Sequence, residues 1–205
     1  MNSAPPLVLA SASPRRAEYL RMLGLEFEVF SADIDEALLD GEDPAAHVER
    51  LAREKASTVQ VLHPDALVLA GDTVVVLDGR ILGKPTDAAD AEAMLMVLAG
   101  RTHTVASALA LGLPDGRVLS GVSHTDVSFR SFSADTARRY VATGEPLDKA
   151  GSYGIQGVGA TLVGDIHGDY YTVVGLPIPL LIRLLLEGGW EYGFGSLVPI
   201  GRGGP

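Results

Sequence analysis

Two arginines stand at the start of an expected helix, where they could bind a phosphate group. An apolar run at residues 7–10 leads into Ser13, a proline, Arg15 and Arg16. Serine is a good N-cap and proline suits the first helical position, so we expect a helix that begins at Ser13 and closes at Gly24. The free N–H groups of that helix end, its positive dipole pole and the two guanidiniums would converge on one anion.

The alternative is that Arg15 and Arg16 only form a solvated helix start. Cations at that position oppose the helix dipole, and here they occur in a chain of formal charge −10. Their presence therefore favours an anion site, and phosphate is its natural ligand.

A carboxylate interrupts the most apolar segment of the chain. Asp72 lies between residues 66–70 and 74–77, which we expect to form a buried strand that stops at residues 71–73 and then resumes. A carboxylate in such surroundings is unfavourable unless it is paired, hydrogen-bonded or bound to a metal. We therefore favour a catalytic role for Asp72 over a structural hydrogen bond.

Further charged residues lie beside apolar elements. Glu36 belongs to an acidic loop after a short strand at residues 27–30, and Lys55 falls on the apolar face of an expected helix over residues 45–62. The Lys55 ammonium needs either a ligand-facing partner or a path to solvent past the core.

The later elements follow from periodicity and turn residues. Asp78-Gly79 predicts a type I′ hairpin that returns Lys84 towards the Asp72 strand. The patterns then predict a helix over 87–99, strands over 102–112 and 117–130, a helix over 134–143, a strand over 169–174 and an apolar helix over 178–187. Residues 145–157 are too long and polar for a plain connector, and the Gly-rich tail beyond Trp190 is expected to lack regular structure.

Several common motifs do not occur in the sequence. The segment from Gly79 to Lys84 has three residues between its glycines instead of four, and Pro85 replaces the hydroxyl residue, so it is not a Walker A loop. The glycines at 151, 154 and 157 do not match the dinucleotide fingerprint. The five histidines show no paired-ligand spacing.

Composition narrows the class of protein. The chain has 205 residues, of which 47% are hydrophobic. This is enough to form the core of one domain, which could consist of two lobes. No apolar run reaches membrane-spanning length and no basic leader begins the chain, so we expect a cytoplasmic protein without membrane contact. The absence of cysteine leaves oxygen and imidazole as metal ligands. A pI near 4.8 argues against nucleic-acid binding and leaves a small phosphorylated ligand compatible.

Taken together, seven short blocks resemble the Maf family of nucleoside triphosphate pyrophosphatases over about residues 7–190. The blocks occur in the family's order and lie at residues 11–16, 53–56, 71–73, 83–85, 145–151, 153–157 and 168–177. The resemblance implies an elongated α/β fold related to the inosine triphosphatases, with a mixed sheet, flanking helices and two lobes around a central nucleotide cleft. It also implies a homodimer and a single two-lobed domain. We expect this domain over residues 1–192, followed by a flexible, Gly-rich tail over 193–205, which the resemblance does not cover.

The resemblance further implies roles for individual residues. Asp72 is expected to accept a proton from water, and with Glu36 to hold a divalent cation, Mg²⁺ or Mn²⁺. The phosphate contacts are expected from Ser13, Arg16, Lys55 and Lys84. Arg15, Thr73 and Gln156 match the subgroup that hydrolyses dTTP and UTP, whereas an aromatic residue at position 15 accompanies hydrolysis of 7-methyl-GTP. The order Ala70-Gly71 departs from many members, which have glycine and then alanine.

The residues fit such a reaction independently. Cleaving a nucleoside triphosphate to the monophosphate and pyrophosphate requires water to attack the α-phosphorus, with cations neutralising the phosphate oxygens. Asp72 and Glu36 offer hard oxygen ligands, and Gln156 could recognise a pyrimidine edge. Whether Asp72 is base, metal ligand or both stays open.

Two other functions are alternatives to a dTTP and UTP pyrophosphatase. They are a 7-methyl-GTP pyrophosphatase and a non-catalytic nucleotide-binding regulator of septum formation. Further roles to be considered for the enzyme are nucleotide house-cleaning and cell-division arrest.

Overall fold

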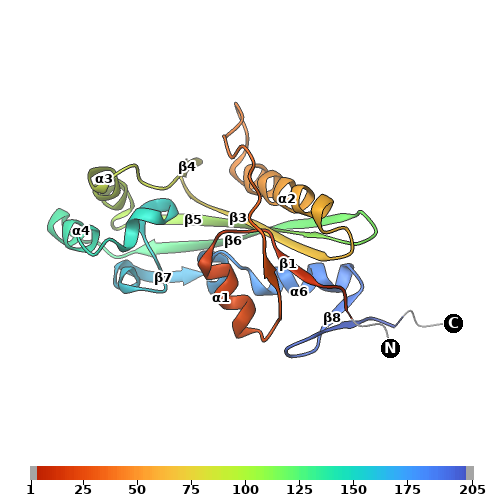
Figure 1. Cartoon of the computed structure of the whole chain (residues 1–205). Coiled ribbons are helices and arrows are strands. Elements are labelled where there is room, and N and C mark those ends of the chain that lie inside the picture. Colours follow the sequence, from red (N-terminus) through yellow and green to blue (C-terminus); the bar gives the residue numbers. More distant parts are fainter. Residues whose placement is uncertain (1–3, 202–205) are drawn as a thin grey trace.

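The chain folds around one long mixed sheet. The computed structural model describes residues 4–201, and Figure 1 shows an elongated molecule with its longest strands running along it. Seven strands form the sheet in the order β2-β1-β3-β5-β6-β7, with β4 paired to β3. Their bounds are β1 (Leu7–Leu9), β2 (Glu28–Val29), β3 (Leu67–Leu77), β4 (Arg80–Leu82), β5 (Thr102–Gly112), β6 (Val118–Phe129) and β7 (Val163–His167). The expected α/β class with a mixed sheet is confirmed.

Two crossover helices make the first part of the sheet parallel. β1 pairs in parallel with both β2 and β3. Parallel neighbours need a long connection, and α1 (Pro14–Met22) and α2 (Pro44–Leu62) provide it. The pairs of β3 with β4 and β5, of β5 with β6, and of β6 with β7 are antiparallel.

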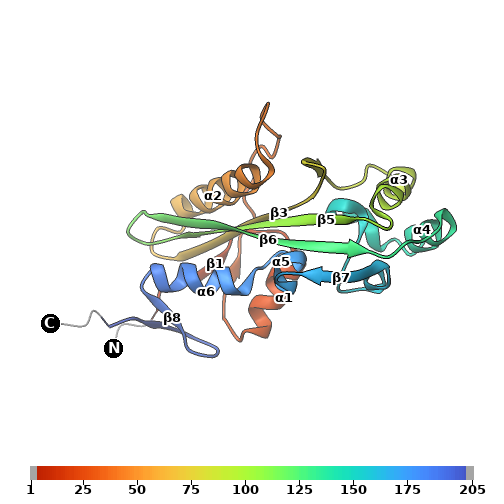
Figure 2. The same cartoon turned by 180° about the vertical axis from the view of Figure 1, so that it is seen from behind.

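Helices cover both faces of the sheet. In both views α2 lies on one face of the central strands and α1 and α6 (Ile178–Glu187) lie on the other (Figures 1 and 2). α3 (Ala88–Leu98) and α4 (Ala134–Val141) pack on each other at one end of the molecule. Among the described residues, no helix is long and apolar enough to cross a membrane.

Successive residues of β3 pack on opposite faces. Leu67 and Leu69 belong to the apolar cluster that includes Leu184 of α6, whereas Val68 and Ala70 belong to the cluster on the α2 side. Because both faces of this part of the strand are covered, residues 67–70 are all apolar instead of alternating with polar residues.

Short sequence patterns correctly predicted the positions of most helices and turns. The expected helices over 45–62, 87–99, 134–143 and 178–187 correspond to α2, α3, α4 and α6. Ser13 is the N-cap of α1, Gly24 follows that helix with φ +70°, and Asp78 and Gly79 form the expected hairpin with φ of 50° and 75°. The expected interruption of β3 at residues 71–73 is wrong, because these residues continue the ladder with β5.

The strand expected over 169–174 is also wrong. The segment forms a short helix, α5 (Tyr170–Val174). Asp169 caps it by accepting hydrogen bonds from Thr172 N at 2.8 Å and Thr172 Oγ1 at 2.9 Å. This cap prevails over the strand preference of the β-branched residues in the segment. Gly175 ends the helix in the left-handed region.

Two segments are more ordered than the sequence indicated. Residues 145–162 contain three short 3₁₀ helices, η1 (Glu145–Asp148), η2 (Ala150–Ser152) and η3 (Val158–Leu162). Beyond α6, β8 (Trp190–Tyr192) pairs with β9 (Leu197–Pro199). Regular structure thus extends past Trp190, contrary to our expectation, while residues 202–205 lie outside the described part of the chain.

One buried histidine makes the stability of the fold sensitive to pH. His103 on β5 is 2% exposed, and its Nε2 lies 2.8 Å from the Tyr153 hydroxyl. Burial lowers the pKa of His103 to about 4, against the opposing charge of Asp126. Between pH 6.5 and 4 the unfolded chain binds a proton that the folded chain does not, so stability falls as the pH falls through this window.

We predict that the lowered pKa of His103 makes the free energy of unfolding about 2 kcal/mol smaller at pH 5 than at pH 7. His103→Gln, which can still bond to Tyr153, should lack this component in urea unfolding at pH 7, 6 and 5. The exposed His124 gives the matched control, His124→Gln, which should retain the wild-type slope. Identical slopes for wild type and His103→Gln would contradict the prediction.

Candidate active site

A buried lysine lies between two carboxylates at the centre of the sheet. Lys55 comes from α2, Asp72 from β3 and Glu36 from the loop between β2 and α2. Lys55 Nζ lies 2.8 Å from Asp72 Oδ1 and 2.6 Å from Glu36 Oε1. The side chains of Lys55 and Asp72 are 11% and 15% exposed. The buried charges of Asp72 and Lys55 therefore neutralise each other, as their apolar surroundings require.

Arg16 is fixed beside these residues by all three of its side-chain nitrogens. Its Nε donates to Gly175 O at 2.8 Å, its Nη1 to Ser11 Oγ at 2.9 Å, and its Nη2 to Thr73 Oγ1 at 3.1 Å. The Thr73 hydroxyl also bonds to the hydroxyl of Ser107 on β5. Burial lowers the pKa of Arg16, and the charge of Asp72 opposes that shift. The guanidinium thus has one fixed orientation in the site.

The parallel pairing of β1 and β3 brings Arg16 to this place. Ala10 N donates to Leu69 O at 2.7 Å, so the start of α1 lies next to the middle of β3. Gly71 permits the close approach: a Cβ there would lie 2.9 Å from Ala108 O and 3.1 Å from Arg16 Nε. Gly71 therefore leaves the space that the Arg16 side chain and the Ala108 carbonyl occupy.

The other residues at the start of α1 face different neighbours. Ser13 makes no side-chain cap hydrogen bond within the described structure, and its N–H donates to Ser11 Oγ at 3.2 Å. Arg15 Nη1 lies 3.9 Å from Asp148 Oδ2, so Arg15 points towards η1 while Arg16 points inwards. The two arginines are therefore not equivalent.

A tyrosine that our sequence interpretation missed holds Gln156. Gln156 is exposed, and its Nε2 donates to the Tyr19 hydroxyl at 3.1 Å. The Tyr19 ring meets the edge of Tyr171, with ring centroids 5.3 Å apart. Tyr19 lies four residues after Arg15 on α1, a spacing that places both on one side of the helix and could have indicated its proximity.

The electrostatics connect Lys84 with the same group. The hydrogen bond from Lys55 lowers the pKa of Glu36, and the charges of Lys84 and Arg16 lower it further against partial burial. Lys84 itself is exposed after β4. Three cations thus act on the region between Asp72 and Glu36, which gives it a positive surplus suited to phosphate.

The donor set suits a hard cation that is shared with substrate. Within residues 4–201, no three histidine, aspartate or glutamate side chains gather into a metal site. Asp72 and Glu36 supply two carboxylates on either side of Lys55. Mg²⁺ typically uses one or two carboxylates together with waters and substrate phosphates, so these two residues fit that ion without a third protein ligand.

A hollow of about 730 Å³ lies on the outer side of α2. Its lining consists of Ile34, Ala46, Glu49, Arg50, Arg53, Glu54, Ser57 and Thr58. Neither Asp72 nor Lys55 belongs to it, so the hollow is separate from the charged group described above.

We predict that Gly71→Ala lowers the stability of the fold. The added methyl would meet the backbone oxygen of Ala108, and such overpacking costs about 1–3 kcal/mol in the free energy of unfolding. Gly83→Ala is the matched control, because a Cβ there has nothing within 4 Å. Chemical denaturation should show a loss for Gly71→Ala alone; equal stabilities of the two variants would refute the packing explanation.

Comparison with known proteins agrees with these observations. The model of the Maf-like protein family matches residues 6–188. A protein of Desulfotalea psychrophila named dTTP/UTP pyrophosphatase is 55% identical, with 88% of this chain and 93% of that protein covered. A Moorella thermoacetica protein of the same name is 54% identical, with 87% and 93% covered. A solved HAM1 protein from Coxiella burnetii is 18% identical with a TM-score of 0.45, over 89% of this chain and 99% of that one. Because the family model spans most of its length, this chain belongs to the Maf-like protein family.

Proposed function

We propose that this protein is a nucleoside triphosphate pyrophosphatase that hydrolyses dTTP and UTP to the monophosphate and pyrophosphate. The observation that carries the proposal is the buried Lys55 ammonium between Asp72 and Glu36, with Arg16 fixed beside them. Such a group combines a candidate base with cations that can neutralise phosphate oxygens. The names of its relatives, dTTP/UTP pyrophosphatases, support this choice of substrate.

In the proposed reaction, cations hold the triphosphate and a carboxylate activates water. The phosphate oxygens contact Ser13, Arg16, Lys55 and Lys84. When the triphosphate binds, Lys55 shifts its hydrogen bonds from the carboxylates to a phosphate oxygen, which leaves Asp72 able to accept a proton. The water oxygen bonds to the α-phosphorus, the bond from that phosphorus to the bridging oxygen breaks, and pyrophosphate leaves with the electron pair.

Asp72 and Glu36 would hold a divalent cation, Mg²⁺ or Mn²⁺. When bound, the cation neutralises charge on the phosphate oxygens. The lowered pKa of Glu36, which results chiefly from the Lys55 hydrogen bond, supports its role as an ionised oxygen ligand.

Selectivity for pyrimidines is assigned to Arg15, Thr73 and Gln156. Gln156 donates to Tyr19 through its Nε2, which supports an orientation in which its Oε1 accepts from the base. The Thr73 hydroxyl accepts a hydrogen bond from Arg16 Nη2, so Thr73 acts indirectly, by holding the Arg16 guanidinium in place. Arg15 argues against the 7-methyl-GTP alternative, and product release by the purified protein would separate an enzyme from a non-catalytic regulator of septum formation.

Other properties expected from the sequence and from the resemblance stay predictions. These are the homodimer, the cytoplasmic location, the single two-lobed domain over residues 1–192 with a central cleft, and any part in house-cleaning or cell-division arrest. Within the tail expected over residues 193–205, Leu197–Pro199 form β9, and residues 202–205 lie outside the described part of the chain.

We predict that Asp72→Asn keeps the fold but lowers turnover of dTTP by about 10²–10⁴, the range for the loss of a general base. Pyrophosphate release measures turnover, and circular dichroism checks the fold. Asp126→Asn, at an exposed residue of β6, is the matched control and should remain active. Near-normal cleavage by Asp72→Asn would remove Asp72 from the mechanism.

We predict that Arg15→Trp changes selectivity more than phosphate binding. The expected loss in kcat/KM for dTTP and UTP is about tenfold relative to other nucleotides, or about 1.4 kcal/mol. Arg138→Trp, on the exposed side of α4, controls for a surface tryptophan. A uniform loss across a nucleotide panel would show that Arg15 does not select the base.

A further inference from the structure

The loop that carries Glu36 has no helix or strand of its own. Residues 30–43 connect β2 to α2 without regular backbone hydrogen bonding, and the side chain of Glu36 is 58% exposed. A loop of this kind is mobile unless specific contacts hold it. The position of the Glu36 carboxylate therefore depends on what attaches the loop to the body of the protein.

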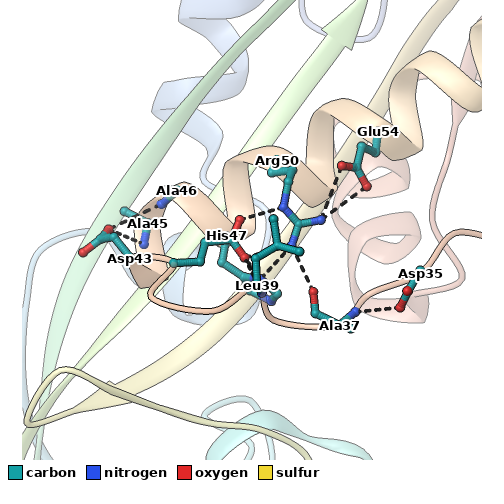
Figure 3. Close-up of polar contacts among 10 residues, drawn as sticks. Asp35, Ala37, Leu39, Asp43, Ala45, Ala46, His47, Arg50 and Glu54 are labelled. Atoms are coloured by element: carbon teal, nitrogen blue, oxygen red, sulfur yellow. Dashed lines mark hydrogen bonds and ion pairs between the residues drawn. The ribbon is translucent and has the colours of Figure 1, made fainter.

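Glu42 and Arg50 provide such an attachment. Figure 3 shows Arg50 extending from α2 towards Ala37 of the loop. Arg50 Nε donates to Glu42 Oε1 at 2.6 Å and Arg50 Nη2 donates to Glu42 Oε2 at 2.8 Å. Glu42 Oε2 also accepts from Leu39 N at 3.2 Å and lies 2.9 Å from His47 Nδ1. The side chain of Glu42 is 9% exposed, so both of its oxygens are used within the protein.

Two further contacts of Arg50 extend this attachment in two directions. Arg50 Nη2 donates to Ala37 O at 3.0 Å, and Ala37 directly follows Glu36. Arg50 Nη1 lies 3.3 Å from Glu54 Oε1 on the same helix. The loop is thus fixed to α2 at adjacent residues, by Arg50 at Ala37 and by Lys55 at Glu36.

We infer that Arg50 is a positioning residue: by bonding Glu42 and the carbonyl of Ala37, it holds the Glu36 carboxylate over Lys55 and Asp72. The inference rests on the proposed function, because it is Glu36's part in that reaction that gives the position its importance. Arg50 touches neither Asp72 nor Lys55, so it acts only through the loop.

Lysine cannot replace arginine in this role. The guanidinium fork makes parallel bonds to both Glu42 oxygens and reaches Ala37 and Glu54 as well, whereas an ammonium offers a single point of attachment. The side chain of Arg50 is 23% exposed, and ion pairs near the surface contribute little to stability. Loss of the fork should therefore disturb the loop much more than the fold.

The test is a double-mutant cycle with Arg50→Lys and Glu36→Gln, assayed by kcat/KM for dTTP. We expect Arg50→Lys to lower kcat/KM at least about tenfold, because small misplacements in an active site can cost 10²-fold. The double variant should lose little more than Glu36→Gln alone, since Arg50 acts through Glu36. Additive losses would overturn the inference.

Hydrogen exchange supplies a readout that does not need turnover. Peptides covering residues 37–42, which include the Leu39 amide bonded to Glu42, should exchange faster in Arg50→Lys, while peptides from β3 should not change. Unchanged exchange in the loop, or faster exchange throughout β3, would show that Arg50 does not position the loop specifically. If wild-type protein failed to cleave dTTP, the proposed function would fail, and the exchange contrast would still decide whether Arg50 holds the loop.

Arg53→Lys is the matched control. Arg53 is three residues further along α2, but it donates to Val118 O at 3.0 Å and Ser120 Oγ at 2.9 Å, away from the loop. This variant should retain wild-type kcat/KM and wild-type exchange in residues 37–42. An equal effect of Arg53→Lys would mean that any change of cation on α2 disturbs the site, which would also overturn the inference.

Discussion

The site depends on the buried ammonium of Lys55 between two carboxylates. The charges of Lys55 and Asp72 would each be strongly unfavourable in these buried surroundings without the other, and removing one partner of a buried pair typically costs about 3–5 kcal/mol. Arg16, fixed by backbone and hydroxyl oxygens on β3, the loop between β1 and α1, and the end of α5, adds a second buried cation. A chain of formal charge −10 thus keeps a local positive surplus, and a phosphate can replace the carboxylates as partner of these cations.

The mixed sheet explains how distant segments reach this point. The parallel pairing of β1 with β3 places the start of α1 beside Asp72, and α2 crosses the same strands on the opposite face, where it contributes Lys55. The same helix also carries Arg50, which fixes the loop of Glu36. Arg50 and Lys55 lie five residues apart on α2. Arg50 therefore holds the loop, while Lys55 pairs with the two carboxylates.

Most of the elements, and the positions of Asp72 and Lys55 on buried elements, could be predicted because their signals are local. Ser13 as an N-cap, the Asp78-Gly79 turn and the stripe that contains Lys55 each occupy a few consecutive residues or one helix. The contacts that orient the site join distant segments, as do Arg16 with Gly175 and Gln156 with Tyr19, and no short pattern encodes them. The helix α5 was missed because β-branched residues follow Asp169, whose cap hydrogen bonds decide the conformation.

The central claim is that this group of charges directs water to the α-phosphorus of a pyrimidine nucleoside triphosphate. The most direct measurement is hydrolysis of dTTP in ¹⁸O-labelled water with Mg²⁺ or Mn²⁺, followed by mass spectrometry of the products. The account predicts label in the monophosphate and none in the pyrophosphate. Label in pyrophosphate, or release of inorganic phosphate and dTDP, would contradict it.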